Sequence, residues 1–229
     1  DPDDTQTSRL YYFENVGSQR APSFEQRAHI PLFTMFHYAP ALGDLDGDGD
    51  LDMLVGTWNA GVALYMNEGT RTEPEFVLQD TTFVRLTRGS NSAPALTDVD
   101  GDGDLDLFIG ESSGELNFYR NVGTPEAPSF DLVSDRFGEI DAGRRSFPTF
   151  ADVDGDGDED LLLGREEGGV LLYRREGSAG ADPLFVLDST FVLPLPNYST
   201  PSLVDIDGDG DLDVFSGGRG GGLIFLEGL

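Results

Sequence analysis

Three features of the 229-residue sequence predict an all-β fold, a β-propeller of four-stranded antiparallel blades. An acidic nine-residue segment occurs four times, starting at Asp44, Asp98, Asp152 and Asp205, which gives a repeat of about 54 residues. Each repeat holds four short strand-like segments, and Gly- or Pro-containing turns separate them. One small twisted sheet buries its faces by stacking on neighbouring sheets, so this pattern is typical of a propeller blade. A parallel β-helix is the rival fold, but its repeats are much shorter.

The second complete repeat shows the expected strands in order. Residues 92–97 form a short first strand that leads into the acidic loop, and residues 105–109 form the second strand. The second strand is apolar on both faces, which predicts burial on both faces. Residues 115–120 alternate more clearly and form the third strand, and a turn leads to the fourth strand at residues 129–133.

The strand count does not correspond to a whole number of blades. The chain begins in a third strand at residues 10–14 and ends in a third strand at residues 223–226, giving about 17 strands where four blades need about 16. The chain is therefore part of a larger propeller, or carries a spare strand, or forms a ring with a second chain. We expect one propeller domain or fragment over residues 1–229, with repeats at 9–32 (partial), 33–86, 87–140, 141–194 and 195–229 (partial).

Composition excludes several classes of function. The 43 acidic residues against 14 basic residues give a net charge of −29, which makes a nucleic-acid-binding surface implausible. All the basic residues are Arg, and without Cys or Lys there is no disulfide, thiolate metal site, Cys nucleophile or lysine Schiff base. No apolar run approaches the roughly 20 residues of a membrane helix, so we expect no membrane insertion.

The acidic loops have the pattern of calcium ligands. Carboxylates stand at loop positions 1, 3, 5 and 9, Gly stands at position 6, and position 7 offers a backbone carbonyl, as in oxygen-rich calcium loops. An EF-hand needs Glu at position 12, where these loops have Val55, Ile109, Leu163 and Ser216. A solvated acidic turn would not explain four copies in register. Mg²⁺ or Mn²⁺ is chemically possible, but the ligand number favours Ca²⁺.

We therefore expect about four Ca²⁺ ions, one in each acidic loop. Close carboxylates repel one another strongly without a cation. The predicted metal-binding residues are Asp44, Asp46, Asp48, Asp50 and Asp52; Asp98, Asp100, Asp102, Asp104 and Asp106; Asp152, Asp154, Asp156, Asp158 and Asp160; and Asp205, Asp207, Asp209, Asp211 and Asp213.

Residues 39–56, their three copies and Asn-x-Gly turns such as residues 121–123 resemble the FG-GAP and VCBS-type repeat family. Calcium-bearing blades of that family build the propeller of integrin α subunits and many bacterial secreted proteins. The resemblance implies a calcium loop between the first and second strands of each blade, on the lower face. The Phe-Gly and Gly-Ala-Pro motifs of the integrin version are degraded here, which weakens the link to integrins. The third loop also departs from the pattern, with Glu159 where the other loops have Leu, so its following strand can start differently.

If the acidic loops form the lower face, the second-to-third and fourth-to-first connections lie on the upper face. Ligands are often met by loops on a rigid scaffold. The alternatives are that Trp58 covers a neighbouring blade and that the Arg residues are solvated or ion-paired. The candidate ligand-binding residues are Trp58, Asn59, Arg88, Asn91, Arg144, Arg145 and Tyr198.

The sequence gives little support for catalysis. His29 and His37 are the only histidines, without a Gly-x-Ser-x-Gly motif or zinc-site spacing. We expect a non-catalytic recognition or adhesion module for an extracellular glycan or protein, stabilised by calcium. The alternatives are the propeller portion of a secreted polysaccharide lyase or hydrolase, and a structural spacer. Abundant calcium points to the extracellular space or cell surface, with a periplasm as the alternative, and further blades or domains can belong to a longer native chain.

Overall fold

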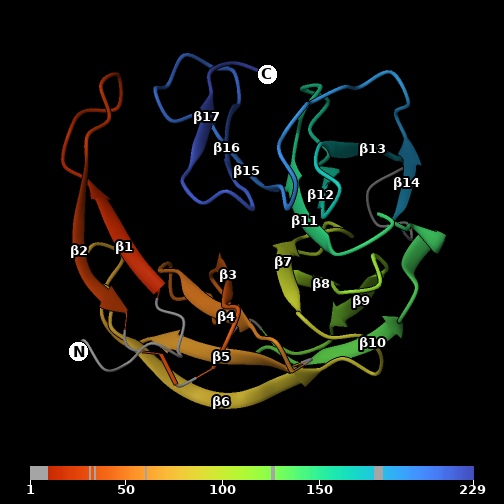
Figure 1. The fold of residues 1–229 in the computed structure, drawn as a ribbon. Coiled ribbons are helices and arrows are strands. Elements are labelled where there is room, and N and C mark those ends of the chain that lie inside the picture. Colours follow the sequence, from red (N-terminus) through yellow and green to blue (C-terminus); the bar gives the residue numbers. More distant parts are fainter. Residues whose placement is uncertain (1–9, 31, 34, 60, 125–126, 178–182) are drawn as a thin grey trace.

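The computed structural model describes residues 10–30, 32–33, 35–59, 61–124, 127–177 and 183–229. Residues 1–9, at the start of the predicted domain, lie outside the described residues. Five antiparallel sheets are arranged in a ring, viewed along its axis in Figure 1. The predicted all-β propeller is confirmed, and the one helical segment among the described residues is a 3₁₀ turn at Phe137–Glu139.

Each sheet consists of strands that follow one another in the sequence. Three sheets have the expected four strands, the first has two and the last has three, so seventeen strands are formed by the described residues. The sheets are β1 (Leu10–Asn15) and β2 (Phe24–Ile30); β3 (Ala39–Gly43), β4 (Asp52–Gly56), β5 (Gly61–Asn67) and β6 (Phe76–Arg85); β7 (Ala93–Thr97), β8 (Asp106–Gly110), β9 (Leu116–Asn121) and β10 (Phe130–Ser134); β11 (Ser146–Ala151), β12 (Asp160–Arg165), β13 (Val170–Glu176) and β14 (Leu184–Leu187); β15 (Thr200–Val204), β16 (Asp213–Gly217) and β17 (Ile224–Leu226).

The strands of the third sheet begin one residue later than the sequence predicted. Strand β8 begins at Asp106, which pairs with Thr97 of β7, and it extends to Gly110. The carboxylate of Asp106 accepts the N–H of Asn121, the last residue of β9. The ninth loop residue is therefore part of the sheet through its backbone pairing with Thr97, and its side chain also binds the third strand.

The second strand of each complete blade is buried on both faces, as predicted. Every residue of β8 is buried, and Phe108 has no exposed surface. The core lies between sheets: Phe108 and Phe118 pack against Leu161 and Leu163 of the next sheet. Burial of apolar surface between blades, about 25 cal/mol per Å², is thus what holds the ring together.

Glycine at the end of each second strand allows neighbouring blades to approach closely. A Cβ at Gly110 would collide with the backbone carbonyl of Ser146 in the next sheet. The same collision would occur between Gly56 and Ser92 and between Gly164 and Ser199. The Gly four residues after each of the first three loops is therefore an inter-blade contact, where backbone packs on backbone, whereas a Cβ at Gly217 would meet Thr200 Oγ1 of its own sheet.

The interface between the last and first sheets differs from the other four. Within the described residues, buried apolar clusters join each pair of consecutive sheets, but no such cluster joins β15–β17 to β1–β2. The turn between β1 and β2 reaches the fourth acidic loop, where a Cβ at Gly208 would collide with the side chain of Gln19. Figure 1 shows this hairpin tip beside the β15–β17 sheet.

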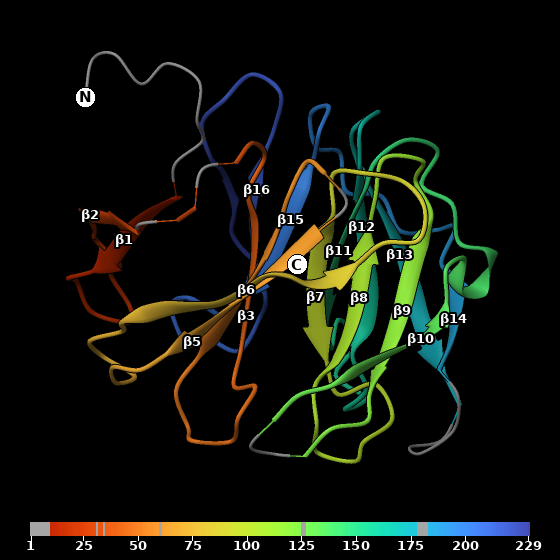
Figure 2. The ribbon, with the colours of Figure 1, turned by 90° about the horizontal axis from the view of Figure 1, so that it is seen from below.

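The strand directions separate two kinds of connection. In Figure 2, β7, β8 and β9 run from one face of the ring to the other. The acidic loops join the first and second strands of a sheet, so they lie at the opposite end of the strands from the second-to-third turns and the connections between sheets. We call the face of the acidic loops the lower face and the opposite face the upper face. No helix formed by the described residues is long and apolar enough to cross a membrane.

Candidate metal loops and axial pocket

The four acidic loops bring carboxylates together on the lower face. In each loop, three Asp residues offer one oxygen each within 4.8 Å of one another. The triads are Asp44, Asp46 and Asp48; Asp98, Asp100 and Asp102; Asp152, Asp154 and Asp156; and Asp205, Asp207 and Asp213. The first three use loop positions 1, 3 and 5, and the fourth uses positions 1, 3 and 9.

Each loop folds around its first aspartate. In the first loop, Asp44 Oδ1 accepts the N–H of Gly47 at 2.7 Å, and Asp44 Oδ2 accepts the N–H of Gly49 at 3.1 Å. Both glycines have positive φ, 73° and 94°. The sharp turn therefore needs Gly at both positions, and it directs the carboxylates of Asp46 and Asp48 toward the loop centre.

The ninth aspartate fastens the loop to the sheet. Asp52 is 2% exposed, and its two oxygens accept the N–H of Asn67 at 2.8 Å and of Leu45 at 3.0 Å. Burial raises the pKa of Asp52, and it raises the pKa of Asp106 to about 6. A buried carboxylate is thus held among other carboxylates, which is costly without a compensating positive charge.

The loops meet the chemical requirements of a hard cation. Within the described residues, Asp50 Oδ1, Asp100 Oδ1 and Asp106 Oδ2 are buried without a hydrogen-bond partner. Buried polar atoms normally have a partner, and Ca²⁺ takes six to eight oxygens in a flexible geometry. The all-oxygen set of each loop therefore fits a calcium ion.

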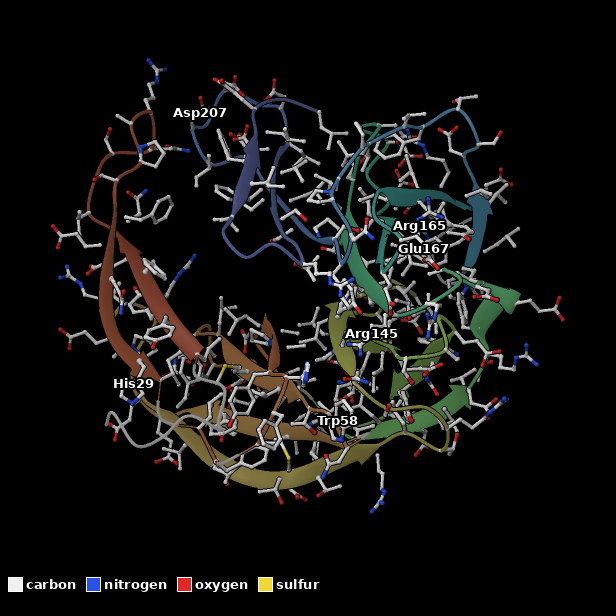
Figure 3. The ribbon with its side chains drawn as sticks, viewed as in Figure 1. His29, Trp58, Arg145, Arg165, Glu167 and Asp207 are labelled. Carbon is white, nitrogen blue, oxygen red and sulfur yellow. The ribbon has the colours of Figure 1, made fainter. Side chains whose placement is uncertain are left out.

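A pocket of about 450 Å³ lies on the upper face at the ring axis. It collects side chains from four successive connections between sheets and from the turn before β17. Figure 3 places Arg145 beside the inner strands β7 and β11, away from Asp207 on the loop before β16. The lining includes His37, Asn91, Arg145, Tyr198, Gly218 and Arg219.

One backbone position repeats around this pocket in the left-handed conformation. His37, Asn91, Arg145 and Tyr198 each stand three residues before the Pro of a first strand, and their φ values lie between 51° and 61°. Hydrogen bonds between blades hold this conformation. Asn91 donates its N–H to the carbonyl of Trp58 in the preceding blade. Ser112, in the turn between β8 and β9, donates its N–H to the carbonyl of Ser90, next to Asn91.

The family model described as an FG-GAP-like repeat matches residues 44–109, 98–163 and 152–216. The chain belongs to the FG-GAP-like repeat family. Each match begins at the first Asp of an acidic loop, so the predicted resemblance is confirmed in the part of the chain that carries the loops. A propeller of FG-GAP-like repeats is compatible with a non-catalytic recognition or structural module. A search of curated proteins finds no significant match.

The third FG-GAP-like loop has an Arg beside its carboxylates, and so does the second loop, where Arg120 Nε lies 3.3 Å from Asp100 Oδ2. Arg174 NH1 lies 2.6 Å from Asp160 Oδ2 and 3.5 Å from Asp154 Oδ2, so a guanidinium already neutralises part of the third loop. Glu159, which replaces the usual Leu, accepts a hydrogen bond from Thr97 Oγ1 at 2.6 Å in the preceding blade. Sequence reasoning missed Arg174, although it stands where the first repeat has Met66.

The structure places some of the predicted ligand-binding residues in the pocket lining and others outside it. Asn91, Arg145 and Tyr198 line the pocket. Trp58 lies at its edge, with its ring 5.5 Å from the ring of His37. The residues outside the lining are Asn59, Arg88 and Arg144, and Arg144 lies 3.7 Å from Glu166.

Sequence reasoning also missed a set of buried serines on the upper face. Ser146 Oγ accepts the N–H of Glu111 at 2.9 Å and donates to the carbonyl of Glu115 at 2.8 Å, which joins two blades. Ser92 and Ser199 make the equivalent bonds. The available signal was a Ser two residues before the Pro in these three repeats.

Proposed function

We propose that the chain is a non-catalytic recognition module, stabilised by calcium, that binds an extracellular glycan or protein ligand in the axial pocket. The observation that carries this proposal is the convergence of four equivalent side chains, one from each of four successive repeats, on one pocket. A pocket of this size is in the range of small-ligand sites. Rigid blades position its lining, as a recognition site requires.

Calcium is part of the proposal because the loops hold more carboxylates than their surroundings neutralise. In the first loop, the ligands would be the side chains of Asp44, Asp46, Asp48 and Asp52 and the carbonyl of Asp50. Each ion would stabilise the folded chain by about 2.7 kcal/mol at a concentration of about 100 times its dissociation constant. Such a requirement suits a location where calcium is always abundant, outside the cell.

The pocket lining favours binding over hydrolysis. Glycoside hydrolysis uses two carboxyl groups on either side of the scissile bond. No carboxylate is among the described residues that line the pocket, and His37 is its one imidazole. The carboxylates of the chain are instead concentrated in the loops on the lower face.

The test is an array of glycans and extracellular proteins probed at about 1 mM Ca²⁺ and again in chelator. The pocket variant is Tyr198→Gly, because Gly removes the side chain and also suits the left-handed backbone. The matched control is Glu139→Gly, which makes the same kind of change at φ 54° outside the pocket.

A calcium-dependent ligand that is lost in Tyr198→Gly and retained in Glu139→Gly supports the proposal. Absence of binding to any array member by chain with a cooperative thermal transition contradicts it. Release of a shortened product from a bound polysaccharide contradicts the non-catalytic part and favours the enzyme alternative.

A further inference from the structure

The left-handed position around the pocket is occupied by different side chains where glycine would be least strained. A non-Gly residue in this conformation carries a steric cost that Gly does not. The chain uses Gly at many other positive-φ positions, including Gly47 and Gly49. At the pocket it has His, Asn, Arg and Tyr instead, although the flanking Pro repeats. The side chains at this position are thus retained against a backbone cost, which is typical of functional sites.

Two guanidinium groups of the pocket lining lie close to the same aromatic ring. Arg145 and Arg219 lie 5.3 Å and 5.9 Å from the centre of the Tyr198 ring. Arg145 Nε is also 3.3 Å from Glu166, whereas Arg219 has no ion-pair partner among the described residues. In a chain of net charge −29, two pocket-lining Arg residues, one of them without an acidic partner among the described residues, offer a local site for an anion.

A second wall offers an unused acceptor. Asn91 Nδ2 donates to Ser90 Oγ at 3.2 Å, but Asn91 Oδ1 is buried without a hydrogen-bond partner. A buried acceptor without a partner is costly. Asn91 lines the pocket, and a turn of its side-chain amide toward the pocket would bring this oxygen to a ligand hydroxyl, which is a suitable donor.

The edge of the pocket is aromatic. The rings of His37 and Trp58 lie 5.5 Å apart, and Trp58 is 49% exposed. A flat, exposed aromatic surface beside polar groups suits the C–H face of a sugar ring, which is apolar on one side and carries hydroxyls around its rim.

We infer that the axial pocket binds a uronic acid unit of an acidic saccharide. Its carboxylate would lie between Arg145 and Arg219, a hydroxyl would donate to Asn91 Oδ1, and the sugar face would pack on the His37 and Trp58 rings. An acidic peptide also supplies a carboxylate, but it lacks a hydroxyl-bearing ring that matches the other two walls. This inference rests on the recognition function proposed above and names its ligand class.

The test uses two sugars that differ in the carboxylate: methyl β-glucuronide and methyl β-glucoside, titrated in excess Ca²⁺. Calorimetry gives the affinities, and emission of Trp58, the one Trp of the chain, reports from the pocket edge. The variants are Arg219→Gln, which breaks no ion pair among the described residues, and Asn91→Gly, which suits the left-handed backbone. Arg71→Gln on the lower-face turn before β6 is the control of equal charge change.

We expect the glucuronide to bind at least about 10-fold more tightly than the glucoside, since hydrogen bonds between charged groups are stronger than those between neutral groups. Arg219→Gln should remove this preference, Asn91→Gly should weaken binding of both sugars, and Arg71→Gln should bind as the wild type does. All variants should keep the thermal midpoint of the wild type within a few degrees.

Equal affinity for the two sugars, or an unchanged preference in Arg219→Gln, would overturn the inference and leave the recognition function standing. Equal losses in Arg71→Gln and Arg219→Gln would also overturn it, because they would indicate long-range attraction only. A blocked tripeptide with a central Asp that binds more tightly than the glucuronide would overturn the sugar assignment. If neither sugar binds and the array of glycans and proteins also shows no binding, the recognition function is overturned as well.

Discussion

The ninth aspartate of an acidic loop combines burial with negative charge. Asp106 is 2% exposed, and burial raises its pKa from 3.8 to about 6. One oxygen accepts the N–H of Asn121, and the other has no partner among the described residues. Such a group is stabilised by a proton or by a cation, and the two compete for the same oxygen.

In chelator, we expect the folded chain to become more stable as the pH falls from 7 to 5. The pKa of Asp106 is raised on folding, so this group adds stability as the pH falls through about 6 toward 3.8 and loses it as the pH rises through 6. Asp106→Asn should reduce this gain, and it should lower stability in excess Ca²⁺. Thermal midpoints at both pH values check this, and an equal gain in wild type and variant would count against it.

The guanidinium of Arg174 should weaken calcium binding in the third loop. It lies 2.6 Å from Asp160 and 3.5 Å from Asp154, so it competes with a cation for the same oxygens. We expect Arg174→Met to raise the calcium affinity of the third loop and to lower the thermal midpoint in chelator, where Asp160 loses its buried partner.

Calorimetric calcium titration of Arg174→Met, with Arg71→Met as the control, measures this effect. Unchanged affinities at all sites would show that the Arg174 guanidinium does not influence the loop.

At the residue scale, the sequence predicted the contacts between residues that are close together in the chain. The Asp residues of a loop lie within nine positions, so their grouping follows from the turn that Gly47 and Gly49 permit. The contact of Arg174 with Asp154 depends on pairing between β12 and β13, and the bond between Ser146 and Glu111 crosses two blades. Such contacts require the register and the stacking of sheets, which one sequence does not contain explicitly.

At the element scale, neighbouring blades are joined by side-chain hydrogen bonds as well as by apolar packing. We expect Ser146→Ala to lower the free energy of unfolding by about 1–3 kcal/mol, because it leaves the buried N–H of Glu111 and carbonyl of Glu115 without their Ser146 Oγ partner. Ser129→Ala, at an exposed position before β10, is the matched control and should have little effect.

Denaturant unfolding in excess Ca²⁺ measures both serine variants. Equal stability of Ser146→Ala and Ser129→Ala would show that the upper-face serines contribute nothing to the joining of blades.

The strands themselves were predictable because their apolar runs are bounded by Gly, Pro and Asp. The one-residue shift of β8 was not, since the pairing of Gly110 with Ala93 and Leu116 depends on the register of the neighbouring strands. The left-handed conformation of Arg145 and Tyr198 was also hidden, because the residue types do not favour it and hydrogen bonds between blades impose it.

At the scale of the whole molecule, charge and fold depend on one another. Removal of calcium should lower the thermal midpoint strongly, because the four loops hold twenty aspartates at short distances. Added NaCl should restore part of the loss through screening, and Mg²⁺ should restore less than Ca²⁺ because it demands a stricter geometry.

Calorimetric scans in chelator, in NaCl, in Mg²⁺ and in Ca²⁺ test this order. A midpoint that does not respond to chelation would show that the loops are stable without a cation, and would remove calcium from the proposed function.

The propeller ring was predictable from the repeat length, and its seam was not. The sequence left open how the unequal terminal strand sets are arranged. The structure forms β1–β2 and β15–β17 as separate sheets that meet at Gln19 and Gly208 without a shared apolar cluster among the described residues. Such an interface depends on side-chain contacts between distant parts of the chain.

The left-handed backbone position on the upper face accepts different side chains in different repeats. The hydrogen bonds that fix the conformation are formed by backbone groups, such as Asn91 N and the carbonyl of Trp58, so these bonds do not depend on the side chain at this position. A mutation there can alter what the pocket recognises without altering how the ring assembles. One such position occurs in each of four repeats. Directed evolution limited to these four positions could therefore change the ligand specificity of the pocket while leaving the propeller scaffold unchanged.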